Sequence, residues 1–311
     1  MPYELSRINA RVKSDPAAFV AECEAEYEKK VLRGAELIRG NLQTSPIVLL
    51  TGPSGSGKTT TAKKLEEKLK HCGVNAYTVS LDNYFLTLDV EKAPKTKSGE
   101  VDYESPKILD MDLLNEHFSM LERGEEIRIP RFVFAQQARS DTKVTPMKLG
   151  KDDVAIFEGI HALNPAVTDE HPLATKLYVS ARSNIYDGGG LCFKSTWTRL
   201  VRRIVRDHLF RGAGAEFTMR LWANMRLGEK TNISPYKELA DYKLDSTLPY
   251  EVCALRLVAE PLFEHVPGDS ERAGELRQIL PAMRRFETVD ESLIPPESML
   301  REFIGGGVYK Y

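Results

Sequence analysis

Apolar residues first recur with a helical period near the start of the chain. Along residues 16–42 the repeat is close to 3.6 positions and includes Phe19, Val20, Cys23, Tyr27, Val31, Leu32 and Leu37. Asp15 and Pro16 precede it, and an aspartate cap followed by proline is typical of a helix start. We therefore expect residues 1–44 to form a helical extension ahead of the first strand.

Short apolar runs then alternate with helical patterns. Strands are predicted at residues 47–50, 75–80, 153–158 and 176–181, and an amphipathic helix at residues 58–73. Strands alternating with helices indicate an α/β fold with a parallel sheet flanked by helices, whose ligands bind at the carboxyl ends of the strands.

The pattern changes twice along the chain. Residues 86–150 are polar and turn-rich, with short β-structure near Pro130, and a long insertion of this kind is often a lid or an acceptor-binding region. From residue 196 onward three segments have helical periodicity: 197–212, 215–230 and 250–266. We expect a core domain over residues 45–255 and a helical addition over 256–311 that packs on it.

Composition narrows the class of protein. The 311 residues carry 43 basic and 45 acidic side chains, a net charge of −2, which argues against a nucleic-acid coat protein. The cysteines are scattered and form no CxxC pair, so neither a zinc site nor a disulfide framework is expected. No apolar run approaches the length of a membrane span and no secretory signal is visible, so we expect a cytoplasmic protein.

The stretch "GPSGSGKTT" fits the phosphate-binding pattern GxxxxGK[ST]. A predicted strand precedes it and a predicted helix follows, as this loop requires. Its glycines let backbone N–H groups turn toward phosphate oxygens, and the helix N-terminus adds a positive partial charge. The predicted ATP-binding residues are Gly52, Pro53, Ser54, Gly55, Ser56, Gly57, Lys58, Thr59 and Thr60.

Two carboxylates follow predicted strands. Asp82 comes just after the strand that ends at Ser80, and Glu158 ends the strand "VAIFE". Phosphoryl transfer needs a metal anchor and a group that orients the attacking hydroxyl. We expect Thr59, Asp82 and Glu158 to hold Mg²⁺, directly or through water, and Asp82 to accept the proton of the acceptor hydroxyl.

An arginine stripe follows in "TRLVRRIVRDHLFRG". Its spacing of i, i+3, i+4 and i+7 predicts one shared helix face for Arg199, Arg202, Arg203 and Arg206. Arg211 follows at the helix end. Isolated stripes are usually solvated faces, but beside a phosphate loop we interpret this one as a lid, with Lys58, Arg206 and Arg211 stabilising charge on the transferring phosphoryl group.

Several stretches together resemble the uridine kinase and phosphoribulokinase group of P-loop kinases. They are "GPSGSGKTT", "SLDNYF", "VDYESPKILD", "IPRFVFAQQAR", "VAIFEGIHAL", "RRIVRDHLFRG" and "ISPYKELADY", in the order of that family, and they cover roughly residues 45–243. The resemblance implies an ATP- and Mg²⁺-dependent kinase. It also implies an acceptor-binding set of Tyr84, Tyr103, Glu104, Phe132, Gln137, Arg139 and Arg203.

The acceptor region departs from the pattern of uridine kinases. Val133 replaces an aspartate, Gln137 a histidine that hydrogen-bonds the pyrimidine, Glu104 the aspartate that holds sugar hydroxyls, and Ala213 a lid arginine. An insertion, "SNIYDGGGLCF", precedes the arginine helix. The phosphoryl-transfer residues therefore match the family while the acceptor pocket is altered.

We interpret the chain as a kinase of a small-molecule hydroxyl, with the 5′-hydroxyl of a uridine- or cytidine-like nucleoside as the leading acceptor. A sugar-like alcohol such as a phosphorylated pentose is the close alternative, and an ATP-binding regulator with little transfer activity is another. We expect neither nucleic-acid nor membrane partners. Oligomeric state, the preference between ATP and GTP, and the role of the "REFIGGGVYKY" tail stay open at this stage.

Overall fold

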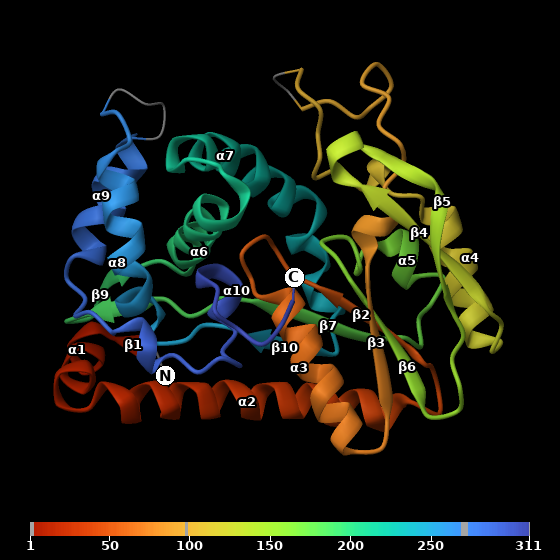
Figure 1. Ribbon diagram of the computed structural model, residues 1–311, viewed down its shortest axis with the longest axis horizontal. Coiled ribbons are helices and arrows are strands. Elements are labelled where there is room, and N and C mark those ends of the chain that lie inside the picture. The colour runs from red at the N-terminus through yellow and green to blue at the C-terminus, as the bar shows by residue number, and fades with distance from the viewer. Residues whose placement is uncertain (1–2, 97–98, 269–272, 311) are drawn as a thin grey trace.

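A computed structural model describes residues 3–96, 99–268 and 273–310, and a five-stranded parallel sheet lies at its centre (Figure 1). The sheet order is β10–β7–β2–β6–β3, where the strands are β2 (Ile47–Thr51), β3 (Asn75–Ser80), β6 (Asp153–Glu158), β7 (Thr175–Ser180) and β10 (Tyr242–Asp245). The four strands expected from the sequence are confirmed, and the short β10 joins them at the edge.

Alternate residues of each strand enter two separate cores, as a sheet covered on both faces requires. On β2, Val48 and Leu50 belong to one core, while Ile47 and Leu49 belong to the other. The first core is covered by helices from both ends of the chain, and the second by the inserted region. The predicted α/β parallel sheet flanked by helices is thus confirmed.

The N-terminal helix is confirmed as α2 (Pro16–Asn41), and Asp15 caps it by accepting a hydrogen bond of 3.0 Å from the Ala18 N–H. Leu32 and Leu37 were wrongly assigned to its apolar face, because both are exposed. Beyond Val31 the buried face continues through residues 34, 35 and 38 instead. A Cβ at position 34 would lie 3.2 Å from a methyl of Leu65 on α3 (Lys58–His71), so glycine lets the two helices meet closely.

The insertion is more regular than its polar sequence indicated. It contains the expected β-structure as a hairpin of β4 (Ile127–Val133) and β5 (Ala138–Met147). It also contains a helix that the sequence analysis missed, α4 (Met111–Glu122), which buries Leu114, Phe118 and Leu121 against the second core. The remaining short helices here are η1 (Leu81–Tyr84), η2 (Pro106–Ile108) and η3 (Phe134–Gln136).

A second missed feature is a small sheet at the edge of the first core. The insertion before the arginine helix forms an antiparallel hairpin of β8 (Ile185–Asp187) and β9 (Gly190–Phe193), turning at residues 188 and 189. β1 (Tyr3–Glu4) pairs in parallel with β8, and α1 (Leu5–Ser14) follows it with Leu5, Ile8 and Val12 buried.

The rest of the chain is mostly helical, as expected. The arginine segment is α6 (Ser195–Arg211), and the next two periodic segments are α7 (Ala215–Asn232) and α8 (Glu251–Glu264). The smaller elements are α5 (Pro165–Thr168), η4 (Ser234–Leu239), α9 (Ala273–Met283), η5 (Glu291–Leu293) and α10 (Arg301–Ile304). Among the helices of the described ranges, none is long and apolar enough to cross a membrane.

Candidate active site

The phosphate loop joins β2 to α3 at the carboxyl edge of the sheet. Gly55 (φ 72°) and Gly57 (φ 83°) adopt left-handed conformations, and a Cβ at Gly52 would lie 2.0 Å from the Val179 carbonyl. A side chain at position 52 would clash with that backbone, and at 55 or 57 it would strain the turn. The loop therefore needs its glycines, and Gly57 delivers the chain into the first turn of α3.

Three consecutive carbonyls of this loop are held from behind. Ser54 O accepts from Arg199 Nη1 at 3.2 Å, Gly55 O from Arg202 Nη1 at 3.1 Å, and Ser56 O from the Ser246 hydroxyl at 2.6 Å. Fixing the carbonyls on this side directs the alternating N–H groups toward the other side of the loop. That side faces a cavity.

This arrangement corrects the interpretation of the arginine stripe. Arg199 forms a bidentate pair with Glu229 at 3.0 Å, and Arg202, fully buried, pairs with Glu251 at 2.5 Å. They support the phosphate loop and are not part of a solvent-facing lid. The arginines do share one side of the helix, since Arg203 Nη1 also donates to the Ser54 hydroxyl at 2.7 Å, but that side faces the phosphate loop and not solvent.

The other arginines of α6 gather around one buried acid that the sequence analysis did not single out. Asp207 lies 3.1 Å from Arg203 Nε, 3.8 Å from Arg206 Nε and 3.2 Å from Arg211 Nη1. It also accepts a hydrogen bond from Thr218 on α7. Asp207 thus orients all three cations toward the cavity, and burial lowers the pKa of Arg206 to about 10.

The cavity, of about 250 Å³, brings together most of the residues expected at the site. It is lined by Ser54, Gly55, Ser56, Gly57, Lys58, Thr59, Asp82, Glu158, Tyr103, Glu104, Arg203, Arg206 and Arg211. Five further lining residues were not expected from the sequence: Phe85, Gly159, Ile160, Met225 and Glu302. Gly52, Pro53 and Thr60 do not line the cavity. The N–H and hydroxyl of Thr60 donate hydrogen bonds to Glu302.

Asp82 and Glu158 meet because their two strands are neighbours. β3 pairs with β6 so that Ser80 lies opposite Glu158, and Asp82 follows on η1. A Cβ on Gly159 would lie 2.7 Å from the Cβ of Leu81, so glycine lets the two loops approach. Burial raises the pKa of Asp82, partly offset by Lys58, and raises the pKa of Glu158 to about 7.

The donor set fits a nucleotide phosphate chain with its metal. Ser56 Oγ and Arg206 Nε are buried without a hydrogen-bond partner, and each could donate to an anion. Thr59, Asp82 and Glu158 offer the hard oxygen ligands that Mg²⁺ prefers, and a cation beside the two acids would favour their charged forms. Within the described ranges no cluster of three metal-binding acids, histidines or cysteines occurs.

The end of the cavity that residues 85, 103 and 104 line is aromatic and acidic. Tyr103 and Phe85 lie there with Glu104, whose pKa burial raises to about 7. A Cβ on Gly228 of α7 would lie 2.3 Å from the Cβ of Glu104. The absence of a side chain at position 228 therefore leaves the space that Glu104 occupies. The Glu104 carbonyl accepts from Asn232 Nδ2 at 2.9 Å, which ties the loop to α7.

Four residues of the expected acceptor set do not line the cavity. Tyr84 is fully buried with its hydroxyl 2.9 Å from His117 Nδ1. Arg139 pairs with Asp110 and donates to the carbonyls of Tyr84 and Phe85, so it holds the hairpin. Gln137 is exposed at the hairpin turn in a left-handed conformation (φ 48°). Phe132 reaches the cavity only indirectly, through its edge contact with Phe85.

A model of the phosphoribulokinase / uridine kinase family matches residues 47–249. The chain belongs to this family. Its membership supports an ATP-dependent kinase of a small-molecule acceptor.

Individual relatives share the core of the chain. A uridine kinase of Staphylococcus aureus (strain JH9) is 27% identical over 201 residues, which are 64% of this chain and 87% of the relative. A solved structure from Silicibacter sp. TM1040, named for a fructose transport system kinase, is 19% identical with a TM-score of 0.50 and covers 68% of this chain and 98% of its own. A D-glycerate 3-kinase from Cryptococcus neoformans is 17% identical with a TM-score of 0.46, covering 67% and 89%. The Silicibacter likeness supports the fold.

Proposed function

We propose that the protein transfers the terminal phosphoryl group of Mg·ATP to a hydroxyl of a small molecule, with a uridine- or cytidine-like nucleoside, at its 5′-hydroxyl, as the leading acceptor. The observation that carries the proposal is the shared cavity. It joins the phosphate loop and Lys58 to Asp82 and continues into an aromatic and acidic end. A donor and an acceptor can therefore lie in line on either side of Asp82.

Each residue has a defined task in this proposal. The Asp82 carboxylate accepts the hydroxyl proton of the acceptor, while Lys58, Arg206 and Arg211 offset charge on the transferring oxygens. When bound, Mg²⁺ would neutralise phosphate charge, held by Thr59 with the carboxylates of Asp82 and Glu158. Asp207 keeps the arginines in place before substrate arrives.

The acceptor end favours a neutral molecule. Tyr103 and Phe85 offer ring surfaces, and Glu104 is an acceptor for sugar hydroxyls. A phosphorylated pentose would bring a second negative charge beside Glu104. Arg203, the cation that acts most strongly on this acid, is already paired with Asp207. For this reason the nucleoside ranks above the phosphorylated sugar.

The test is ADP release with Mg·ATP across nucleosides, neutral sugars and sugar phosphates. We expect one acceptor class to stimulate release. Asp82→Asn should lower kcat at least about 10²–10⁴-fold, because it removes the proton acceptor and one carboxylate of the metal site, while the intact phosphate loop still binds ATP. Asp89→Asn, an exposed acid outside the cavity, is the matched control. Tight ATP binding with no stimulation by any acceptor would favour a regulator instead.

A further inference from the structure

A second cavity adjoins the first where α6 ends. It has a volume of about 410 Å³, and the C-terminal segment, residues 301–309, forms its outer wall together with Phe210. Arg206, Arg211 and Glu302 line both cavities. The two spaces therefore meet at these three side chains, and neither Tyr103 nor Glu104 lines the second one.

Glu302 shows which part of a phosphate chain would reach this junction. Its carboxylate accepts from the Thr60 N–H at 3.2 Å and from the Thr60 hydroxyl at 2.7 Å, and it lies 3.6 Å from Arg206 Nη1. The Glu302 carboxylate thus occupies the Thr60 and Arg206 donors, which are also suited to bind a phosphate. In a loop of this pattern the lysine reaches the β- and γ-phosphates, while the backbone cradles the α- and β-phosphates.

The direction of a bound triphosphate follows from these positions. Its terminal phosphoryl group must lie near Lys58 and Asp82, because the acceptor hydroxyl approaches from the aromatic end. The α-phosphate then lies toward the first turn of α3 and Glu302. Whatever is attached to the α-phosphate leaves the loop at the junction and enters the second cavity.

The wall of the second cavity suits a flat, polar-edged ring. The Phe210 ring is 57% exposed, and Tyr309 lies nearby. Residues 305–307 are glycines that cover the wall with backbone alone, and a Cβ at Gly305 would lie 2.8 Å from Phe210. A volume of about 410 Å³ lies within the usual range for small-ligand pockets.

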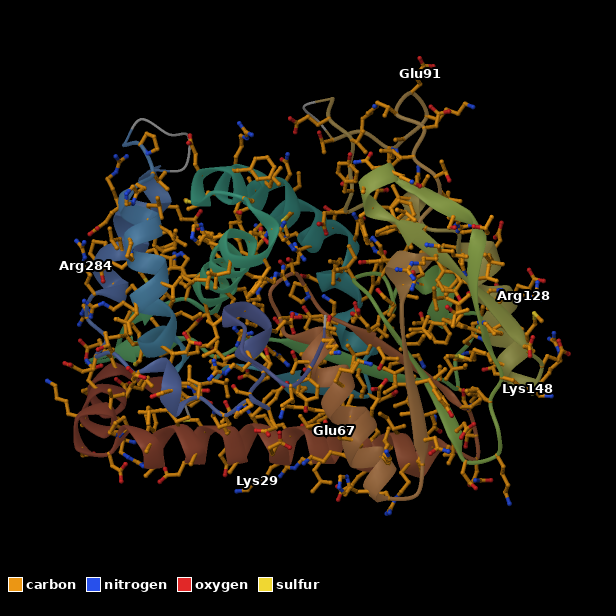
Figure 2. The ribbon with its side chains drawn as sticks, in the orientation of Figure 1. Lys29, Glu67, Glu91, Arg128, Lys148 and Arg284 are labelled. Atoms are coloured by element: carbon orange, nitrogen blue, oxygen red, sulfur yellow. The ribbon has the colours of Figure 1, made fainter. Side chains whose placement is uncertain are left out.

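The segment that forms the wall is anchored to the rest of the molecule. Arg301 donates to Glu291 Oε1 at 2.7 Å and to the carbonyl of Ile294 at 2.7 Å. At the far end, the Tyr309 hydroxyl donates to Glu67 Oε2 at 2.8 Å, on the α3 side chain labelled in Figure 2. The cavity is therefore built by the fold and does not depend on a loose tail.

We propose that this second cavity binds the nucleoside part of the phosphoryl donor, with its base against the Phe210 ring and the glycine backbone of residues 305–307. The inference rests on the proposed function, since it needs a nucleoside triphosphate on the phosphate loop. It assigns the C-terminal segment to the donor site. Phe210 and the segment, which lie outside the phosphate loop, would then set donor preference.

The experiment compares two ligands by titration calorimetry, Mg·ATP and inorganic tripolyphosphate with Mg²⁺. The second has the phosphate chain without the nucleoside. We expect Phe210→Ala to weaken ATP binding about tenfold, because base–ring stacking is lost, and to leave tripolyphosphate binding unchanged. Tyr309→Ala should act in the same direction. Phe217→Ala, an exposed phenylalanine on α7 absent from both cavity linings, should change neither.

Two results would overturn the inference while the proposed function survives. One is wild-type affinity of Phe210→Ala and Tyr309→Ala for ATP. The other is an equal loss for both ligands, which would assign the residues to phosphate binding. If the unaltered protein binds neither ligand, the proposed function fails and the inference fails with it.

Discussion

At the scale of single residues, the site contains an acid that the fold does not favour in its charged form. Burial raises the pKa of Glu158 to about 7, above its ordinary value of 4.5. The folded chain therefore holds a proton more tightly than the unfolded chain between these pH values, so the glutamate costs stability increasingly as the pH rises from 4.5 to 7.

Replacing this acid should stabilise the protein and disable it. We expect Glu158→Gln to raise the unfolding free energy at pH 8 by on the order of 1–3 kcal/mol, with a smaller gain at pH 5, where the folded-state carboxyl is already protonated. Thermal unfolding at both pH values measures this, and Mg²⁺-dependent ADP release should fall. Glu126→Gln, at an exposed position, is the control. An equal gain at both pH values would contradict the stated cause.

Glu302 leads to a prediction of the opposite kind, about affinity. Its carboxylate occupies donors of Thr60 and faces Arg206, so it repels incoming phosphates. Glu302→Gln keeps an acceptor for Thr60 but removes the charge, and the Kd for Mg·ATP should fall about three- to tenfold. Glu297→Gln removes the same charge from an exposed site nearby and should leave the Kd unchanged. Weaker binding by Glu302→Gln would show that the carboxylate helps to hold the donor.

These residues also show how far the sequence reaches. Asp82 and Glu158 could be placed together because each follows an apolar strand, and parallel strands end at one edge of a sheet. Glu302 could not be placed, because it meets Thr60 across 242 positions and no local pattern records such a contact. Tyr84 and Arg139 fall in family-like stretches, yet hydrogen bonds to His117 and Asp110 take their polar groups away from the cavity.

At the scale of elements, α6 has two functions on one helix. Its first two arginines support the phosphate loop from behind, and its later ones reach the cavity. The residue spacing predicted one shared face, and Arg199, Arg202 and Arg203 do all contact the phosphate loop. Spacing alone does not show which acids pair with these arginines. The partners Glu229 and Glu251 come from α7 and α8, which only the folded chain brings to α6.

The buried pair of α6 and α8 should be essential to stability. Arg202→Met leaves Glu251 charged and unpaired in the interior, so the unfolding free energy should fall by about 3–5 kcal/mol. Adding Glu251→Gln should recover part of the loss through a coupling of about 1–3 kcal/mol, because the stranded charge is gone. Denaturant titrations of both single variants and the double variant measure this coupling.

An exposed pair gives the comparison. Arg284, at the rim of the molecule in Figure 2, pairs with Glu260 at 2.6 Å, and Arg284→Met should cost at most about 1 kcal/mol. For the buried pair, the contrary outcome is a double variant whose loss of unfolding free energy equals the sum of the two single losses. Arg202 and Glu251 would then stabilise the fold independently of each other.

At the scale of the whole molecule, both ends of the chain are packed into the same core as the sheet. The Glu24 carboxylate on α2 accepts from the Tyr250 hydroxyl at 2.5 Å and from the Ser298 hydroxyl at 2.6 Å, which joins three distant segments. The Tyr27 hydroxyl lies 2.7 Å from Thr61 Oγ1 on α3. The long α2, which runs along one side of the molecule in Figure 1, thus reaches the helix that follows the phosphate loop.

We therefore propose that residues 1–44 are part of the kinase fold and not a separable extension. Val20, Tyr27, Val31 and Ile38 are all at most 1% exposed, and burying each such side chain stabilises a fold by about 1.5–3 kcal/mol. Their joint loss is comparable to the 5–15 kcal/mol that stabilises a whole domain. A chain lacking residues 1–44 should therefore show no cooperative thermal transition and no ATP binding.

A control variant, Tyr27→Phe, removes only the hydroxyl and should keep the fold at a cost of about 1 kcal/mol. Adding residues 1–44 as a separate peptide should restore both signals, because the packing surface on α3, β7 and β10 would be covered again. Cooperative unfolding with intact ATP binding in the truncated chain would instead show that residues 45–311 fold alone.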